Sequence, residues 1–447
     1  MSQGFFFLLI KKKHLLDFPG YATLLVLLFS HILMFLKVEP FYTWFYLFAW
    51  FSYIFLIDSI IYNFKGNSLI RSRGKEILIL SSWSVVFWFI FETVNFFLKN
   101  WYYINLPSND FLRISGTIFA FATVLPGIFG TTEIIEDSNI YNKLTTKSFK
   151  FPTYFLWVLI LSGVLFAFSS IAVPEIFFPL IWGSFTLILE PILYFLGGRS
   201  LLKDLEAGKP RKILILLTAG LICGFLWEFW NYWAYSKWVY TLPIFNQGKI
   251  FEMPVAGFLG FPPFAIDCYV MYNFVCFFRE GAGWEKTSHP IYSSLPKSVT
   301  SFIVPLIMLA FSYGVILNME KYTIDSYESS IKDISLVPAK NSAYLAENGL
   351  SRIHKFVRNC ENPRNLKKIS VDLNVPVKSV QKWCDFAELT EFQGIGAANL
   401  LILKKAGIES ILDLSKTSPE ILIDKFSDKP SGRIKLWINE AKKMQKL

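Results

Sequence analysis

The stretch Ile77–Pro107, ILILSSWSVVFWFIFETVNFFLKNWYYINLP, decides the fold of this chain. It opens with an apolar run long enough to cross the hydrocarbon core of a bilayer as a helix, which takes about 20 residues. Only a helix satisfies its own backbone hydrogen bonds at that depth. The chain contains nine such segments, near residues 20–36, 41–63, 77–98, 112–130, 153–172, 176–196, 213–235, 254–278 and 299–317.

These segments predict an all-α protein, in which a polytopic membrane helix bundle is followed by a small soluble helical domain. We place the membrane domain at residues 1–318, a linker at 319–346 and the soluble domain at 347–447. The composition agrees, because only 17% of the 447 residues are charged and 53% are hydrophobic, whereas soluble domains carry about 25% charged residues. With four His and no Cys-x-x-Cys spacing, neither a metal site nor a cofactor is expected.

The distribution of Lys and Arg between alternate connections predicts the orientation, because cytoplasmic loops carry the excess. Connections on one face carry 18 of these residues, namely Lys11, Lys12, Lys13, Lys65, Arg71, Arg73, Lys75, Lys143, Lys147, Lys150, Arg199, Lys203, Lys209, Arg211, Lys212, Arg279, Lys286 and Lys297. Connections on the other face carry five, namely Lys37, Lys99, Arg113, Lys237 and Lys249. The N-terminus is therefore predicted to be cytoplasmic, and nine spans would place the tail outside.

The opening stretch has a second copy further along the chain, at one constant offset. Glu92 and Asn95 match Glu228 and Asn231, and Ile77–Leu80 matches Ile213–Leu216. Further matches at this offset or close to it are Leu106-Pro107 with Leu242-Pro243, Pro126 with Pro262, Trp101 and Tyr103 with Trp238 and Tyr240, and Asp58 with Glu190. We predict two parallel four-helix repeats, at about 17–150 and 151–280, with the ninth span at 299–317.

Ionisable and amide side chains within the predicted spans are the candidate site residues. A carboxyl and an amide at positions i and i+3 share one face of a helix, and an acid at mid-bilayer costs roughly 2.5–3.5 kcal/mol. Glu92 and Glu228 are the candidate acids, with Asn95 and Asn231 orienting them. Candidate substrate-binding residues are Trp101, Tyr103, Trp238, Tyr240, Asp58, Glu190 and Asp267. The alternative is a structural hydrogen-bond network between helices.

The order of features in each repeat resembles the lycopene cyclase type of carotenoid membrane domain. In that family an acid and a Trp-x-Tyr segment precede a Pro-x-Glu-Glu segment, which does not occur in this sequence. The resemblance implies an apolar cavity for an isoprenoid. It also implies that Glu92 or Glu228 protonates a double bond, while aromatic faces stabilise the resulting cation.

The C-terminal residues contain a Gly-x-Gly turn between helical segments. The run from Leu389 through Gly394 and Gly396 to Leu422 resembles a helix-hairpin-helix family known only as a domain of unknown function. In helix-hairpin-helix domains, such a turn brings backbone N–H groups to a DNA phosphate. From Ala346 onwards the chain carries 18 Lys and Arg against 12 Asp and Glu. A protein partner is the alternative, in which the two glycines make a tight interhelical turn.

Three functions remain open from the sequence. The first is a membrane protein that binds, and in a further step transforms, an isoprenoid-like lipid at a polar site between the repeats. The second is a transporter or carrier of a small or lipidic substrate. The third is a non-catalytic membrane anchor that presents the C-terminal domain to a protein or nucleic-acid partner. Nucleic-acid binding requires a cytoplasmic tail, which conflicts with nine spans and leaves the side of the tail open.

Overall fold

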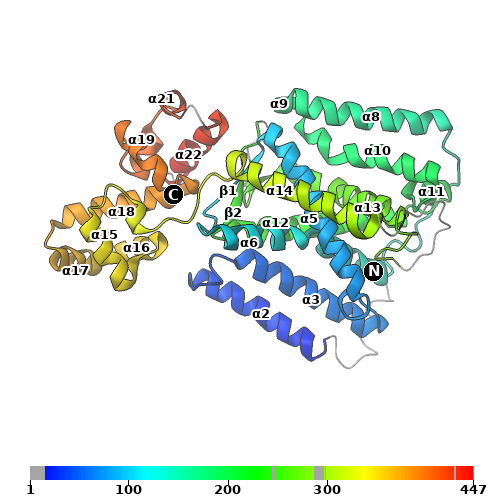
Figure 1. Ribbon diagram of the computed structural model, residues 1–447, viewed down its shortest axis with the longest axis horizontal. Helices are drawn as coiled ribbons and strands as arrows, with labels where there is room; N and C mark the ends of the chain where they lie inside the picture. Colours follow the sequence, from blue (N-terminus) through cyan, green and yellow to red (C-terminus); the bar gives the residue numbers. More distant parts are fainter. Residues whose placement is uncertain (1–15, 244–247, 286–295, 297–298, 427–428, 446–447) are drawn as a thin grey trace. The chain divides into compact units, whose positions relative to one another are not determined.

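The computed structural model describes residues 16–243, 248–285, 296, 299–426 and 429–445 (Figure 1). Of the residues that predicted the orientation, Lys11–Lys13, Lys286 and Lys297 lie outside this part of the chain. The chain divides into two compact units. The membrane unit comprises Met1–Leu98, Ile114–Tyr235 and Ile244–Met319, and the tail unit comprises Lys99–Arg113, Ser236–Pro243 and Glu320–Leu447.

Within the described residues, nine helical segments are long and apolar enough to cross a membrane. They are α2 (Phe18–Phe35), α3 (Phe45–Lys65), α5 (Gly74–Leu98), α6 with α7 (Asp110–Ala122 and Val124–Asp137), α8 (Thr153–Ala172), α9, η1 and α10 (Pro174–Phe177, Phe178–Leu180 and Ile181–Leu196), α12 (Arg211–Trp233), η2 with α13 (Val255–Gly260 and Phe261–Phe277) and α14 (Val304–Tyr322). The predicted all-α, multi-pass architecture is confirmed. Short connecting elements are α4 (Leu69–Ser72), α11 (Leu201–Glu206), β3 (Lys249–Ile250) and β4 (Met253–Pro254).

The order of elements supports the predicted duplication. The series α2, α3, α4, α5, β1, α6–α7 is followed by the series α8, α10, α11, α12, β2, η2–α13. Within the first series α7 packs against α3 and α5, and within the second α13 packs against α10 and α12. Between the series the contacts are reciprocal, because α7 packs against α12 and α13 packs against α5. The four helices α5, α7, α12 and α13 therefore form the centre of the membrane unit.

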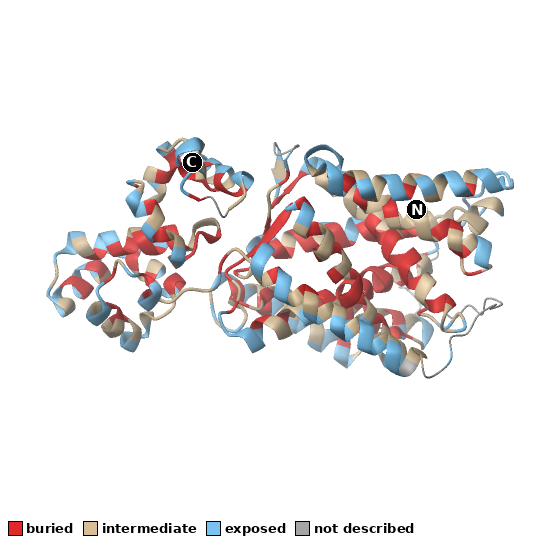
Figure 2. Ribbon diagram, turned by 45° about the horizontal axis from the view of Figure 1, so that its top comes forward, coloured by how far each residue is buried: buried red, intermediate tan, exposed pale blue. Residues whose placement is uncertain are grey.

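The outer helices leave their apolar side chains uncovered. In the apolar stretch of α8 that could span the membrane, only 17% of the residues are buried, whereas in the corresponding stretch of α6–α7 the fraction is 72%. Trp157, Leu161, Leu165 and Phe168 of α8 are all more than half exposed. Figure 2 shows buried residues concentrated in the inner helices, with exposed residues along the outer ones. A continuous apolar surface of this kind is unfavourable in water and suits the hydrocarbon of a bilayer.

Close packing of α12 against α13 depends on two glycines. A Cβ atom built on Gly224 would lie 2.2 Å from the ring of Phe261, and one built on Gly220 would lie 2.5 Å from the carbonyl oxygen of Phe261. This is the small-xxx-small pattern, which brings helix backbones together in membranes.

We expect Gly224→Ala to destabilise the purified full-length protein by about 1–3 kcal/mol, because the added methyl group overpacks the helix contact. Thermal unfolding in detergent would measure this. Gly183→Ala on α10 is the matched control, since a Cβ there meets nothing within 4 Å. Equal melting temperatures for the two variants would rule out the close contact between α12 and α13.

The tail unit contains a two-stranded antiparallel sheet made by the two repeats. Strand β1 (Trp101–Ile104) follows α5 and strand β2 (Lys237–Tyr240) follows α12. Trp101 pairs with Tyr240, and Tyr103 pairs with Trp238. Each Trp of the duplicated Trp-x-Tyr motif thus faces the Tyr of the other copy. Reciprocal pairing of equivalent residues is the signature of a two-fold axis.

The rest of the tail unit is helical, with a hydrophobic core of its own. Its helices are α15 (Ala339–Leu345), α16 (Ile353–Cys360), α17 (Pro363–Leu373), α18 (Val377–Glu391), α19 (Leu400–Lys405), α20 (Ile411–Lys416), α21 (Pro419–Ile423) and α22 (Ser431–Met444). Residues 319–346, predicted as a linker, contribute Ile331, Ile334 and Val337 to this core. The stretch around them is polar, but their spacing of three residues was a signal of an apolar face that the linker prediction overlooked.

Candidate functional site

The two carboxyl–amide pairs lie on central helices of the membrane unit. Glu92 and Asn95 lie near the C-terminal end of α5, and Glu228 and Asn231 lie near the C-terminal end of α12. All four side chains are completely buried. The i, i+3 spacing places each carboxyl and its amide on one face of the helix. Burying an ionisable group in a bilayer is costly, so a pair that occurs twice at matching positions is a candidate site.

Aromatic rings connect the surroundings of the two carboxyls. Phe264 of α13 lies 5.9 Å from Trp88 and 5.3 Å from Phe91 on α5, measured between ring centroids. The same Phe264 ring lies 5.8 Å from Trp227, the residue before Glu228 on α12. Trp88 also donates a hydrogen bond of 3.1 Å from Nε1 to Oε1 of Glu92. Helices α5 and α12 therefore meet the same phenylalanine next to their acidic residues.

A second aromatic group surrounds Glu228 on the side of α3. The Trp50 ring lies 5.3 Å from that of Trp227 and 5.0 Å from that of Trp230. Tyr46, one turn before Trp50, interacts electrostatically with Glu228. Trp230 donates a 3.1 Å hydrogen bond to Nε2 of His31 on α2. Polar tips of aromatic side chains thus accompany Glu228 inside an otherwise apolar bundle.

Asp267 joins two helices of the second repeat. Its Oδ1 accepts a 2.8 Å hydrogen bond from the Thr186 backbone N–H on α10 and a further one from the Thr186 hydroxyl. Its Oδ2 has no hydrogen-bond partner among the described residues. The position that matches it in the first repeat is Thr131, whose hydroxyl bonds that of Tyr53 on α3 at 2.8 Å. The two positions therefore make equivalent interhelical hydrogen bonds.

Asp58 and Glu190 make the same contacts in both repeats. The carboxylate of Asp58 accepts hydrogen bonds of 2.8 Å from the Ser68 hydroxyl and from the Ile70 backbone N–H, at the start of α4. Glu190 accepts bonds of 2.6 and 2.9 Å from the Ser200 hydroxyl and the Leu202 N–H, at the start of α11. Each acid thus holds the beginning of a short helix, where N–H groups lack helical partners.

The structure does not bring Asp58 and Glu190 together with the carboxyl–amide pairs. The connection that Asp58 contacts leads into Gly74, the first residue of α5, whereas Glu92 lies close to the other end of that helix. At the helical rise of about 1.5 Å per residue, Gly74 and Glu92 are about 27 Å apart along the axis of α5. Trp101, Tyr103, Trp238 and Tyr240 belong to the sheet of the tail unit. The part that these six residues play in substrate binding stays a prediction.

A layer of ion pairs, which the sequence analysis missed, links the two repeats. Arg73 donates to both carboxylate oxygens of Glu133 at 2.9 Å. Glu76 on α5 pairs with Arg279 beyond α13 at 2.7 Å. At the matching position of the second repeat, Lys212 pairs with Glu136 of α7 at 2.6 Å and with Glu285. The opposite charges of Glu76 and Lys212, which stand at equivalent positions of the two copies, were the signal for these pairs.

The basic residues of this layer keep the Glu285 carboxyl negatively charged. Burial by itself raises the pKa of its carboxyl, but the charges of Lys212 and Arg199 outweigh that effect. Hydrogen bonds from Lys212 and Tyr269 act in the same direction, so the pKa lies below its ordinary value. Glu285 is consequently ionised at neutral pH. Four of the basic residues that predicted the orientation, Arg73, Arg199, Lys212 and Arg279, are paired with acids in this layer.

The Gly-x-Gly turn of the tail unit is enclosed by the chain itself. Gly394, Ile395 and Gly396 are buried. A Cβ atom on Gly394 would lie 2.3 Å from Cγ2 of Ile104 in β1, and one on Gly396 would lie 3.3 Å from Cβ of Ser326. Before Gly394, the carbonyl of Gln393 accepts hydrogen bonds from Arg433 and Trp437. The backbone of Gly394 and Gly396 is therefore packed against Ile104 and Ser326.

The fold defines a multi-pass membrane protein with a helical C-terminal domain. A domain of unknown function, DUF4332, is found at residues 337–444, in agreement with the predicted C-terminal domain of unknown function. No curated protein matches the chain, and no solved structure does. The resemblances to lycopene cyclase domains and to helix-hairpin-helix domains thus gain no support from known proteins and stay predictions.

Proposed function

We propose that the membrane unit binds an isoprenoid-like lipid at a polar site between its two repeats. The observation that carries the proposal is the complete burial of Glu92, Asn95, Glu228 and Asn231 on the central helices α5 and α12. Such groups are expensive at membrane depth and are usually retained for function.

The residues around the carboxyls support the proposed ligand class. The rings of Trp88 and Phe91 on α5 and of Trp227 on α12 all lie within 5.9 Å of the Phe264 ring on α13. Sites for apolar ligands are lined by aromatic side chains with a few polar groups that fix orientation. An extended, unsaturated lipid suits aromatic surroundings of this kind better than a hydrophilic solute does, which favours lipid binding over transport of a small polar substrate.

A reaction of the bound lipid would use the same residues. A carboxylic acid at Glu92 or Glu228 would protonate a carbon–carbon double bond, with Asn95 or Asn231 holding its orientation. The carbocation that forms would be stabilised by the neighbouring indole and phenyl faces. The second carboxyl, as a carboxylate, would stabilise the same positive charge.

The orientation proposal places the protein in the cell membrane with a cytoplasmic N-terminus. It rests on the ratio of 18 to five Lys and Arg residues between the two faces, which follows the rule that cytoplasmic loops are positive. The ion-paired layer around Arg73, Glu133 and Lys212 would then lie at the cytoplasmic face.

Mass spectrometry of lipids extracted from gently purified full-length protein tests the proposed ligand. We expect an unsaturated isoprenoid-like lipid with the wild type and at least a tenfold loss of it in the Glu92→Gln/Glu228→Gln variant. That loss would correspond to about 1.4 kcal/mol or more of binding free energy. Glu133→Gln is the matched control, because this acid is also buried but pairs with Arg73 and is not a candidate site residue.

Two results would contradict the proposal. One is an unchanged lipid content in the double variant that folds like the wild type. The other is an equal loss of lipid in Glu133→Gln, which would show that a buried acid outside the proposed site matters just as much and that the loss reflects folding. Substrate flux across vesicles that depends on Glu92 and Glu228, without retained lipid, would favour a carrier instead.

A further inference from the structure

The side of the membrane on which the C-terminal domain lies can be read from the backbone of the tail unit. The segment that follows α14 runs parallel to β1 and the residues after it, and forms two isolated β-bridges with them. Tyr103 N–H donates to the carbonyl of Thr323, and Asp325 N–H donates to the carbonyl of Tyr103, both at 2.8 Å. Further along, Glu328 N–H donates to the carbonyl of Leu106 at 2.7 Å. The beginning of the tail therefore lies on the same side as the connection between α5 and α6.

The count of spans agrees with these hydrogen bonds. The connection that contains β1 follows the third span, that containing β2 follows the seventh, and the tail follows the ninth. Connections after odd-numbered spans lie on one side of a membrane. A tail on the other side would need eight or ten spans, and it would be unable to pair with β1. The conflict between the number of spans and a cytoplasmic tail is thus resolved in favour of nine spans.

The face that carries β1 and β2 is poor in basic residues. Its connections hold the five residues Lys37, Lys99, Arg113, Lys237 and Lys249, against 18 on the opposite face. By the positive-inside rule this is the outer face.

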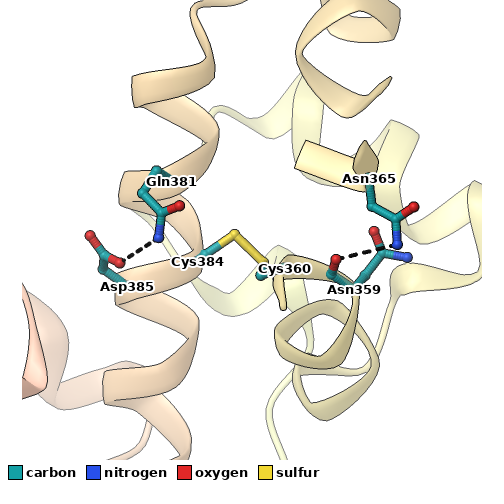
Figure 3. The surroundings of a disulfide bond; sticks show 6 residues. All are labelled: Asn359, Cys360, Asn365, Gln381, Cys384 and Asp385. Atoms are coloured by element: carbon teal, nitrogen blue, oxygen red, sulfur yellow. Dashed lines mark hydrogen bonds between the residues drawn. A yellow bond between two sulfur atoms is a disulfide. The ribbon is translucent and has the colours of Figure 1, made fainter. Parts of the chain in front are cut away.

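A disulfide bond gives an independent indication of the compartment. Cys360 at the end of α16 is bonded to Cys384 of α18, 24 residues later (Figure 3). Cys384 is completely buried and Cys360 is 9% exposed. Structural disulfides form and persist in oxidising compartments outside the cytoplasm, and they are rare in the cytosol.

We infer that the C-terminal domain lies outside the cytoplasm, where Cys360 and Cys384 are oxidised to a structural disulfide. The two thiols give up two electrons and two protons to the disulfide of an extracytoplasmic thiol oxidase, which becomes a dithiol. This inference goes beyond the proposed lipid function and does not depend on it. It also excludes cytoplasmic nucleic acid as the partner of the domain, in accordance with the buried Gly-x-Gly turn.

Labelling of introduced cysteines tests the side of the domain. Lys367→Cys on α17 and Lys147→Cys between α7 and α8 are both at exposed positions. Intact cells, with any outer layers removed, are treated with a membrane-impermeant maleimide. We expect labelling of Lys367→Cys before permeabilisation and labelling of Lys147→Cys only after it. The reverse order would overturn the inference.

The disulfide is tested on the wild-type full-length chain, denatured and treated with a maleimide that adds measurable mass. Cys223, Cys268 and Cys276 are free, so we expect three added groups before reduction and five after it. The Cys360→Ser/Cys384→Ser variant is the control and should give three in both cases. Five groups without reduction would show that the thiols are not oxidised, and this result would overturn that half of the inference.

Discussion

Replacing Asp325 with asparagine is expected to lower the free energy of unfolding of the tail unit by about 3–5 kcal/mol. The Asp325 carboxylate pairs with Lys429 at 2.7 Å and with Arg433. The Arg433 side chain is completely buried and that of Lys429 is 13% exposed. An amide at position 325 would leave these cations in a low-dielectric interior without a counter-charge. The loss would be measured by thermal unfolding of the full-length protein. The resistance of the tail unit to protease would serve as the signal that this unit is folded.

An exposed ion pair in the same unit provides the matched control. Lys382 and Glu409 lie 2.6 Å apart, but their side chains are 47% and 36% exposed. Pairs in such positions contribute at most about 1 kcal/mol. Glu409→Gln should therefore change the stability far less than Asp325→Asn. Similar losses from both substitutions would show that the pairing of Asp325 with Arg433 is not buried.

The pH dependence of the tail unit should report the same group. Burial raises the pKa of Asp325, but the charges and hydrogen bonds of Arg433 and Lys429 outweigh it, so the pKa lies below its ordinary value. A carboxyl with a lowered pKa stabilises the fold above its unfolded-state pKa of about 3.9, and it loses that contribution as the pH falls through the folded-state value. Stability should hold near neutral pH and fall below about pH 4. The stability of the Asp325→Asn variant should not show this part of the pH dependence.

The spans and the duplication could be predicted because the bilayer imposes strong constraints on sequence. An apolar run of about 20 residues has few alternatives to a spanning helix. The shared offset between Glu92–Asn95 and Glu228–Asn231 needed no structure to be recognised. The reciprocal packing of α7 with α12 and of α13 with α5 agrees with it in space.

Features that depend on contacts distant in sequence were not predictable. The strand Trp101–Ile104 is only four residues long, and its aromatic residues equally suit a membrane interface. Its pairing with β2 and with the segment after α14 depends on parts of the chain that several spans separate from it. Likewise, Cys360 and Cys384 could be recognised only as two thiols of the tail, because their pairing depends on the packing of α16 against α18.

A buried network of the tail unit explains why a Gly-x-Gly turn occurs at this position. Asp325 donates its backbone N–H to Tyr103 in β1 and accepts from Arg433 through its side chain. Arg433 in turn donates to the carbonyl of Gln393, directly before Gly394. The first residues after the last span, the loop of the first repeat and the turn of the C-terminal domain are thus joined through one buried network. The glycines allow the backbone to approach β1 closely.

We expect Gly394→Ala to destabilise the tail unit by about 2–5 kcal/mol, the sum of two contributions. Gly394 has a φ of +67°, and its Cβ would lie 2.3 Å from Cγ2 and 2.5 Å from Cβ of Ile104. A left-handed conformation costs an alanine about 1–2 kcal/mol, and overpacking a core adds about 1–3 kcal/mol. Thermal unfolding gives the total. Hydrogen exchange at the amides of Tyr103 and Asp325 shows whether the pairing with β1 is lost.

Gly407→Ala separates the two contributions. Gly407 has a φ of +80°, but a Cβ there meets nothing within 4 Å. It should therefore show only the conformational cost of about 1–2 kcal/mol, with unchanged exchange at Tyr103 and Asp325. If Gly394→Ala were no more destabilising than Gly407→Ala, the turn would not be packed against Ile104. Its backbone would then be accessible to an external partner.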